Sequence, residues 1–139
     1  MSTIIRPEIS KKNKYWISKD RYYELKHFCL QYPIWKSTYA AFCDVDIPLS
    51  MIENAPTSNM PGDPTGKRAI MKAYYKEKID LIERIAADAD KYLYEYILKA
   101  VTEELSYTYL RSKLDIPCGR DMYYDRYRRF FWLLSHARD

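Results

Sequence analysis

Glycine is scarce in this chain: only three of the 139 residues are glycine. Hairpins and bulges need glycine for backbone conformations that other residues avoid, whereas long helices with few connections need very little. Hydrophobic residues make up 47% and charged residues 30%, which is the balance of a folded globular protein. The sequence therefore predicts an all-α fold, a helical bundle of about five or six helices with a C-terminal helix-turn-helix.

Four segments differ in their spacing of apolar, proline and charged residues. Residues 1–14 are polar and basic, and we expect a flexible basic arm. Residues 15–44 carry aromatic side chains at helical spacing, so we expect an aromatic helical pair. Residues 45–63 are rich in proline and other turn formers and are expected to be a loop. Residues 64–139 are expected to form a helical domain.

The first of the two aromatic helices has a clear start signal, because Ser18 can serve as its N-cap. Pro33 then interrupts the pattern and is expected to push Tyr32 out of helical geometry, since proline restricts the residue before it. The second helix is expected to carry three aromatic residues along one face: Trp35, Tyr39 and Phe42.

A long helix is expected after the loop. Asp63 and Pro64 have the order of an N-cap and a first helical residue, and the apolar period continues to about Ala89. Four apolar residues at helical spacing are expected to form its buried face: Ile70, Tyr74, Leu81 and Ile85. Another helix is expected near residues 92–100.

The clearest pattern lies in residues 106–137. Ser106 can cap a short helix, 107–114, and residues 115–119 form a tight connection whose apolar residue, Ile116, can plug the gap between two helices. Four residues in and just before the short helix are expected to point toward the core: Leu105, Tyr109, Leu110 and Leu114. A long helix, 120–137, is expected to bury one face: Tyr123, Tyr127, Phe130, Phe131 and Leu134. This outline predicts a helix-turn-helix, although a plain helical hairpin with a charged outer face has the same outline.

Residues 105–131 also resemble the C-terminal part of small phage transcriptional regulators of the ArpU and RinA type, and the distant region 4 of sigma factors. The resemblance rests on the Ile116-Pro117 turn and on the aromatic and arginine-rich run of residues 123–131. It implies that one set of residues faces the DNA groove (Arg120, Asp121, Tyr124, Asp125 and Arg128) and another touches the backbone (Ser106, Thr108 and Arg129). Arg126 is expected to add affinity. Cys118-Gly119 replaces the family's usual capping serine.

These features and the resemblance predict a DNA-binding transcriptional regulator of phage or mobile-element origin that binds duplex DNA. Arginine can pair with guanine or hold phosphates, and aspartate can accept from cytosine. A homodimer is expected because one short unit contacts few phosphates. The net charge of +4 is compatible with a nucleic-acid partner.

The alternative is a protein-interaction module whose helix-turn-helix is structural, either a homo-oligomer or an inhibitor of a host protein such as an anti-CRISPR. Three tryptophans are the candidate interface residues: Trp16, Trp35 and Trp132. Residues 15–33 are similar to uncharacterised proteins of prophages and mobile elements in gut Firmicutes, which implies a genomic setting but no chemistry.

An enzyme is not expected, because the sequence contains no P-loop, dinucleotide turn or nucleophile elbow. No cofactor or metal is expected either: the three cysteines are far apart, and the acid pairs Asp44/Asp46 and Asp88/Asp90 are expected at solvated helix ends. No run is apolar enough to span a membrane, so a cytoplasmic location is expected.

Overall fold

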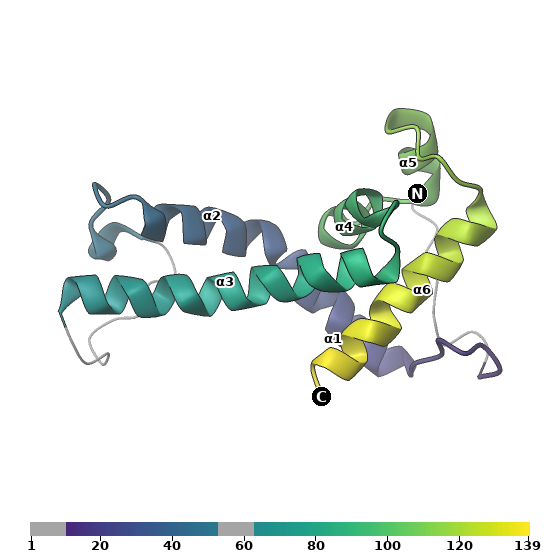
Figure 1. Ribbon diagram of the computed structural model, residues 1–139, viewed down its shortest axis with the longest axis horizontal. Helices are drawn as coiled ribbons and strands as arrows, with labels where there is room; N and C mark the ends of the chain where they lie inside the picture. Colours follow the sequence, from purple (N-terminus) through teal and green to yellow (C-terminus); the bar gives the residue numbers. More distant parts are fainter. Residues whose placement is uncertain (1–10, 53–62) are drawn as a thin grey trace. The chain divides into compact units, whose positions relative to one another are not determined.

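The computed structural model describes residues 11–52 and 63–139 (Figure 1). In these ranges every element of regular structure is a helix: α1 (Lys19–Leu30), α2 (Tyr32–Cys43), the 3-10 helix η2 (Leu49–Met51), α3 (Pro64–Ala89), α4 (Tyr94–Glu103), α5 (Tyr107–Lys113) and α6 (Arg120–Ala137). The predicted all-α class is confirmed. Parts of the predicted arm and loop, residues 1–10 and 53–62, lie outside the described residues.

The chain divides into two compact units. The first consists of the chain up to Gln31 together with Ile82–Asp139, and the second consists of Tyr32–Leu81. The division between Gln31 and Tyr32 falls inside the predicted aromatic pair, residues 15–44. Among the described helices, none combines the length and the apolar character that crossing a membrane requires.

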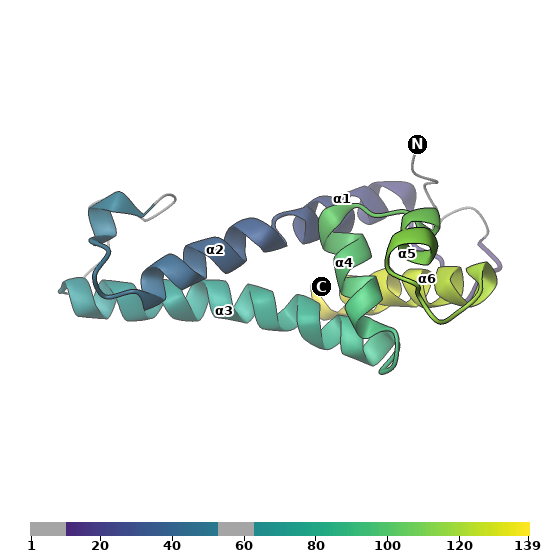
Figure 2. The same ribbon diagram turned by 90° about the horizontal axis from the view of Figure 1, so that it is seen from above.

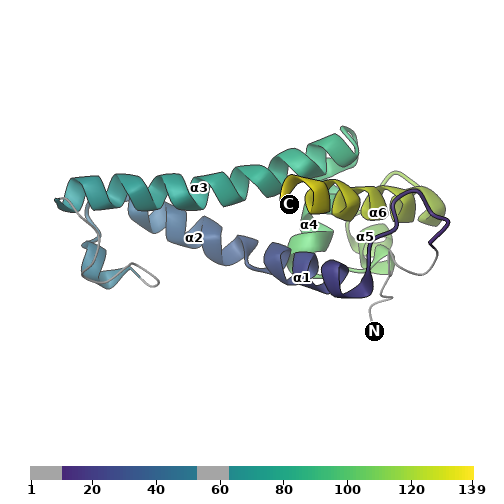
Figure 3. The ribbon, with the colours of Figure 1, turned by 90° about the horizontal axis from the view of Figure 1, so that it is seen from below.

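The core of the first unit lies where α1, α4 and α6 pack on one another (Figure 3). Phe131 of α6 is fully buried, and its ring lies edge-on to the Tyr22 ring of α1 at 5.1 Å. The Tyr22 hydroxyl forms a hydrogen bond of 2.7 Å with the hydroxyl of Tyr127. Burial raises the pKa of Tyr127, as does its contact with Tyr22, so this phenol stays neutral across the physiological range.

The second unit is an antiparallel pair formed by α2 and the first part of α3 (Figure 2). Phe42 stacks on Tyr75 with ring centroids 6.0 Å apart, and Phe42 and Tyr75 are both buried. Arg68 of α3 donates hydrogen bonds to four backbone carbonyls at and beyond the end of α2: those of Ala41, Phe42, Asp44 and Ile47. This guanidinium satisfies carbonyl groups that the end of a helix leaves without partners.

The predicted helix starts are confirmed. The hydroxyl of Ser18 accepts from the Arg21 amide at 3.3 Å, and the carboxylate of Asp63 accepts from the Gly66 amide at 2.7 Å. α3 ends at Ala89 as expected. The predicted helix 120–137 coincides with α6.

Two predicted helices differ from the observed ones in their limits. α2 begins at Tyr32, so helical geometry starts before Pro33 rather than after it. Pro33 lies in the first turn of α2, where an amide hydrogen would have no helical acceptor, so proline costs little there. The helix expected near residues 92–100 begins later and runs further, as α4.

Two predicted buried faces are partly wrong. Ile70 and Tyr74 of α3 are each 50% exposed, because the helix meets α2 through the neighbouring stripe that contains Tyr75. In α5, Tyr109 is 44% exposed and Tyr107 is buried instead. In both helices two adjacent stripes contain apolar residues, and periodicity alone does not tell which stripe meets the core.

Candidate nucleic-acid interface

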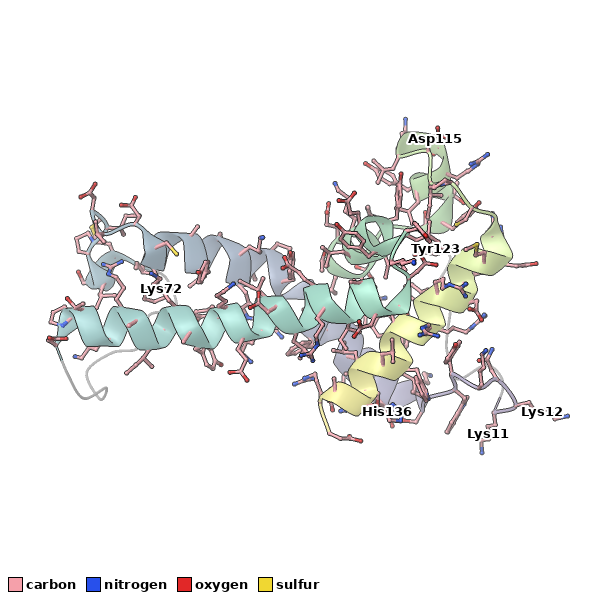
Figure 4. The ribbon with its side chains drawn as sticks, in the orientation of Figure 1. Lys11, Lys12, Lys72, Asp115, Tyr123 and His136 are labelled. Atoms are coloured by element: carbon pink, nitrogen blue, oxygen red, sulfur yellow. The ribbon has the colours of Figure 1, made fainter. Side chains whose placement is uncertain are left out.

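The connection between α5 and α6 is held by a buried apolar residue. Ile116 is fully buried, as the plug prediction requires, and its amide donates to the Leu110 carbonyl at 3.1 Å. Asp115 makes this return of the chain possible by adopting a left-handed conformation, with φ of 54°. Asp115 lies at the outer end of the connection (Figure 4).

Two side chains of α5 fix the rest of the connection. The Tyr107 hydroxyl donates to the Cys118 carbonyl at 2.7 Å, and the Arg111 guanidinium donates to the Ile116 carbonyl at 3.0 Å. The Ser106 hydroxyl accepts from the Tyr109 amide at 3.1 Å, so it caps α5 as predicted. Together these bonds hold α6 in a defined position relative to α5.

Arg120, the first residue of α6, is held by two tyrosines. Its guanidinium carbon lies 5.1 Å from the Tyr107 ring centroid and 5.9 Å from the Tyr124 ring centroid. One guanidinium nitrogen donates to the Tyr124 hydroxyl at 3.0 Å. Cation–π contact and this hydrogen bond restrict the arginine while it stays exposed, which reduces the entropy lost when it binds an anion.

The first two turns of α6 present their outer side to solvent. Asp121 and Met122 are exposed, and Asp125 and Arg128 are partly exposed. In the described part of the chain Arg128 has no ion-pair or hydrogen-bond partner. No side chain caps the amides of the first turn, because the N-cap residue is Gly119. Uncapped amides at a helix N-terminus favour negatively charged groups.

Arg126 is engaged within the unit. Its Nε donates to Oδ2 of Asp90 at 2.9 Å, and it also pairs with Asp125. The other oxygen of Asp90 accepts from the amides of Tyr92 and Leu93, at 2.8 and 2.9 Å. The Asp90 side chain is only 8% exposed, so its expected place at a solvated helix end is wrong, whereas Asp88 is exposed.

Burial by itself would raise the pKa of Asp90, but the hydrogen bonds from the Tyr92 amide, the Arg126 guanidinium and the Leu93 amide outweigh it and hold the pKa below its ordinary value. A carboxyl group whose pKa is lower in the folded protein stabilises the fold above its unfolded pKa of about 4. That contribution is lost as the pH falls through the lowered value.

The Asp90→Asn variant is expected to lower the free energy of unfolding by about 1–3 kcal/mol at pH 7, because the amide keeps an acceptor for the two backbone donors but loses the ion pair with Arg126. Urea unfolding at pH 7 and at pH 3 measures the difference from the wild type, which should shrink at the lower pH. Asp88→Asn is the matched control and should have little effect. An equal difference at both pH values would contradict the role given to this carboxylate.

The segment before α1 covers the second half of the outer side of α6. Tyr15 is 7% exposed, and its ring centroid lies 5.6 Å from that of Trp132. Arg129 donates to the Tyr15 hydroxyl at 3.2 Å, and the Nε of Arg129 is buried without a hydrogen-bond partner. Arg129 and Trp132 therefore hold the segment onto α6.

The same segment carries cations beside α6. Lys11, Lys12 and Lys14 are exposed, and Lys11 and Lys12 extend away from the helices (Figure 4). The Lys11 ammonium lies 5.8 Å from the ring centroid of Trp16, and the Lys14 ammonium lies 5.0 Å from that of Tyr15. The anchored segment thus carries basic side chains beside the second half of α6, where Tyr15 packs on Trp132 and Arg129.

The structure thus brings some of the predicted residues together and separates others. Arg120, Asp121, Tyr124, Asp125 and Arg128 lie along the first turns of α6, and Thr108 is exposed on α5. Arg126, Arg129 and Ser106 are bonded within the unit. Trp35 is 6% exposed, in the second unit. Sequence reasoning missed Tyr107, for which the pattern held no signal that set it apart from Tyr109.

The described residues contain no group of three histidine, cysteine, aspartate or glutamate side chains that could hold a metal ion. Cys29 is buried, and this burial raises the pKa of its thiol despite the nearby Arg138, which favours a packed rather than a reactive role. No protein-family model, curated protein or solved structure matches the chain.

Proposed function

We propose that this chain binds duplex DNA through α5, the connection after it and the first two turns of α6, and that it acts as a phage-type transcriptional regulator. The observation that carries the proposal is that the start of α6 is exposed and held in place. Buried Ile116 and the hydrogen bonds between α5 and the α5–α6 connection hold it. A helix with exposed N-terminal turns, supported by a short helix before it, is the part of a helix-turn-helix that enters the major groove.

The exposed groups suit the two kinds of contact that such a helix makes. Arg120 and Arg128 can donate in pairs to guanine or hold phosphate oxygens, and the carboxylates of Asp121 and Asp125 can accept from cytosine. The uncapped amides at Gly119 and beyond suit a phosphate group. The two carboxylates repel phosphates, so they favour a pose in which they point at base edges.

The anchored segment adds a second contact. Tyr15 holds it against α6, so the nearby lysines lie beside the helix that would enter the groove. Lysine ammonium groups hold phosphates without reading sequence, and each phosphate contact makes binding more dependent on salt. In this arrangement Arg129 holds Tyr15 in place and does not itself contact DNA.

The competing function is a protein-interaction module with a structural helix-turn-helix, and it predicts a different effect of changes at the start of α6. It needs no anion contact at the start of α6, so adding negative charge there would leave binding to its partner unaffected. A change at Gly119 therefore separates the two functions.

The Gly119→Asp variant is expected to raise stability and lower DNA affinity. Gly119 has extended backbone angles, φ −78° and ψ 172°, and a Cβ built on it meets no atom within 4 Å, so aspartate fits as an N-cap. A capping aspartate adds a few tenths of a kcal/mol of stability over glycine. Its charge near a phosphate costs about 1 kcal/mol, or about fivefold in affinity. Urea unfolding and fluorescence anisotropy with a random-sequence duplex measure the two effects.

Gly119→Ser is the matched control, because serine caps the helix without adding charge. We expect it to gain similar stability and to bind DNA more tightly than the aspartate variant, because it occupies the same amides but adds no negative charge. If the aspartate variant binds duplex DNA as tightly as the serine variant, the start of α6 does not lie against phosphates and the proposed pose is wrong.

A further inference from the structure

The second unit exposes β-branched aliphatic side chains. Among the described residues, the exposed large hydrophobic side chains of the first unit are three tyrosines and Met122, whereas those of the second unit are three β-branched residues, Met51 and Tyr74. The three β-branched residues are Ile34, Val45 and Ile70, and they are between 50% and 81% exposed. In the described part of this unit α2 and α3 are the only two α-helices, so their outer apolar residues have no further α-helix to pack on.

The exposed residues of α3 have the spacing of a helix-packing seam. Ile70 and Tyr74, each 50% exposed, lie within a series of five residues separated by steps of three and four: Lys67, Ile70, Tyr74, Glu77 and Leu81. Steps of three and four are those of the a and d positions of a coiled coil, which face a partner helix. Within this series Ile70 and Tyr74 lie next to each other, with Lys67 before them and Glu77 after them.

Ile34 of α2 extends the same face. Trp35 and Tyr75 are buried, and the Lys78 ammonium lies 5.3 Å from the Trp35 ring centroid and 4.9 Å from the Tyr74 ring centroid. Ile34 and Tyr74 each precede a buried aromatic by one residue, which is a rotation of about 100° around the helix. α2 and α3 run antiparallel (Figure 2). In an antiparallel pair, equal rotations away from the facing residues bring both positions to the same side of the pair.

The charges on the seam indicate what covers it. Lys67 is partly exposed and Glu77 is exposed, and neither has an ion-pair partner in the described part of the chain. If two copies of α3 lie antiparallel with a two-fold axis level with residue 72, Ile70 meets Tyr74 of the other copy. In the same register Lys67 meets Glu77 of the other copy, twice. A parallel pairing would instead place like charges opposite each other.

We infer that the second unit is a homodimerisation element in which α3 packs antiparallel on α3 of a second copy, through Ile70 and Tyr74 flanked by reciprocal Lys67–Glu77 ion pairs. Such an isologous contact closes after two copies. With α2 alongside, the two helical pairs form a four-helix arrangement. The inference goes beyond DNA binding, and its failure would leave the proposed function of α5 and α6 untouched.

Sedimentation velocity of the full chain over a range of concentrations tests the inference. The chain mass is 16.7 kDa, so we expect a concentration-dependent species of twice that mass. Ile70→Glu should weaken the dimer at least about 100-fold, because a charge enters the contact twice. Ala69→Glu is the matched control: it places the same side chain on an exposed neighbouring position outside the seam, and should leave the dimer intact.

Charge exchange tests the register. Lys67→Glu or Glu77→Lys alone should weaken the dimer about tenfold, and the double variant that carries both changes should restore it. A wild type that stays monomeric at every concentration overturns the inference, since the seam would then be covered in some other way. A dimer that survives Ile70→Glu overturns it as well, and a dimer that the double variant fails to restore overturns the antiparallel register.

Discussion

Replacing Phe131 by alanine is expected to lower the free energy of unfolding of the first unit by about 3–5 kcal/mol. The ring is fully buried and lies 5.1 Å from Tyr22 of α1 and about equally close to Tyr127 and Phe130, at 5.0 Å each. Its removal leaves a cavity at the contact between α1 and α6. Because small domains have total stabilities of about 5–15 kcal/mol, the loss is a large part of the whole.

Urea unfolding followed by circular dichroism measures this loss. Met122→Ala is the control, because Met122 lies on the same helix and is 44% exposed, so it should change stability by no more than about 0.5 kcal/mol. Equal effects of the two substitutions would mean that α6 does not pack through the Phe131 face.

The second large effect is expected from removing two arginines at once. The Arg120→Ala, Arg128→Ala double variant should bind random duplex DNA about 100-fold more weakly at low salt, since each charge-assisted hydrogen bond is worth about 1.5 kcal/mol or more. The slope of log affinity against log salt should fall by about 1.8, which corresponds to two lost phosphate contacts. Fluorescence anisotropy at several salt concentrations gives both quantities.

A control with the same change in net charge separates contact from long-range attraction. Lys72 and Arg84 are on α3, a helix that contributes no residue to the proposed surface, and the double variant Lys72→Ala, Arg84→Ala should keep nearly all of the affinity and slope. Arg129→Ala should act differently again, by loosening Tyr15 and lowering stability. If the two double variants weaken binding equally, DNA is not held at the start of α6.

The helix starts were predictable because their signals are local. Ser18, Asp63 and Ser106 each precede the helix that they cap by one residue, and each accepts from an amide three residues ahead. The burial of Ile116 was predictable as well. Ile116 lies between two strongly periodic segments, and its side chain has no polar group that would favour contact with solvent. Such features depend on neighbours in the chain and can be read without the fold.

The contacts that decide the site depend on residues far apart in the sequence. Asp90 and Arg126 are separated by 36 positions, and Tyr15 and Arg129 by 114. No local pattern tells that Arg126 is neutralised inside the unit while Arg128 stays available. For the same reason the sequence assigned similar roles to neighbouring arginines that the fold places in different surroundings.

Binding of the wild-type chain to duplex DNA is the most direct test of the proposed function. Anisotropy of a labelled random-sequence duplex, titrated with the protein between about 50 and about 200 mM salt, measures it. We expect micromolar or tighter binding at the low end and a steep linear fall of log affinity with log salt. Absence of binding at the lowest salt, or binding that salt does not weaken, would contradict the proposed role of α5 and α6.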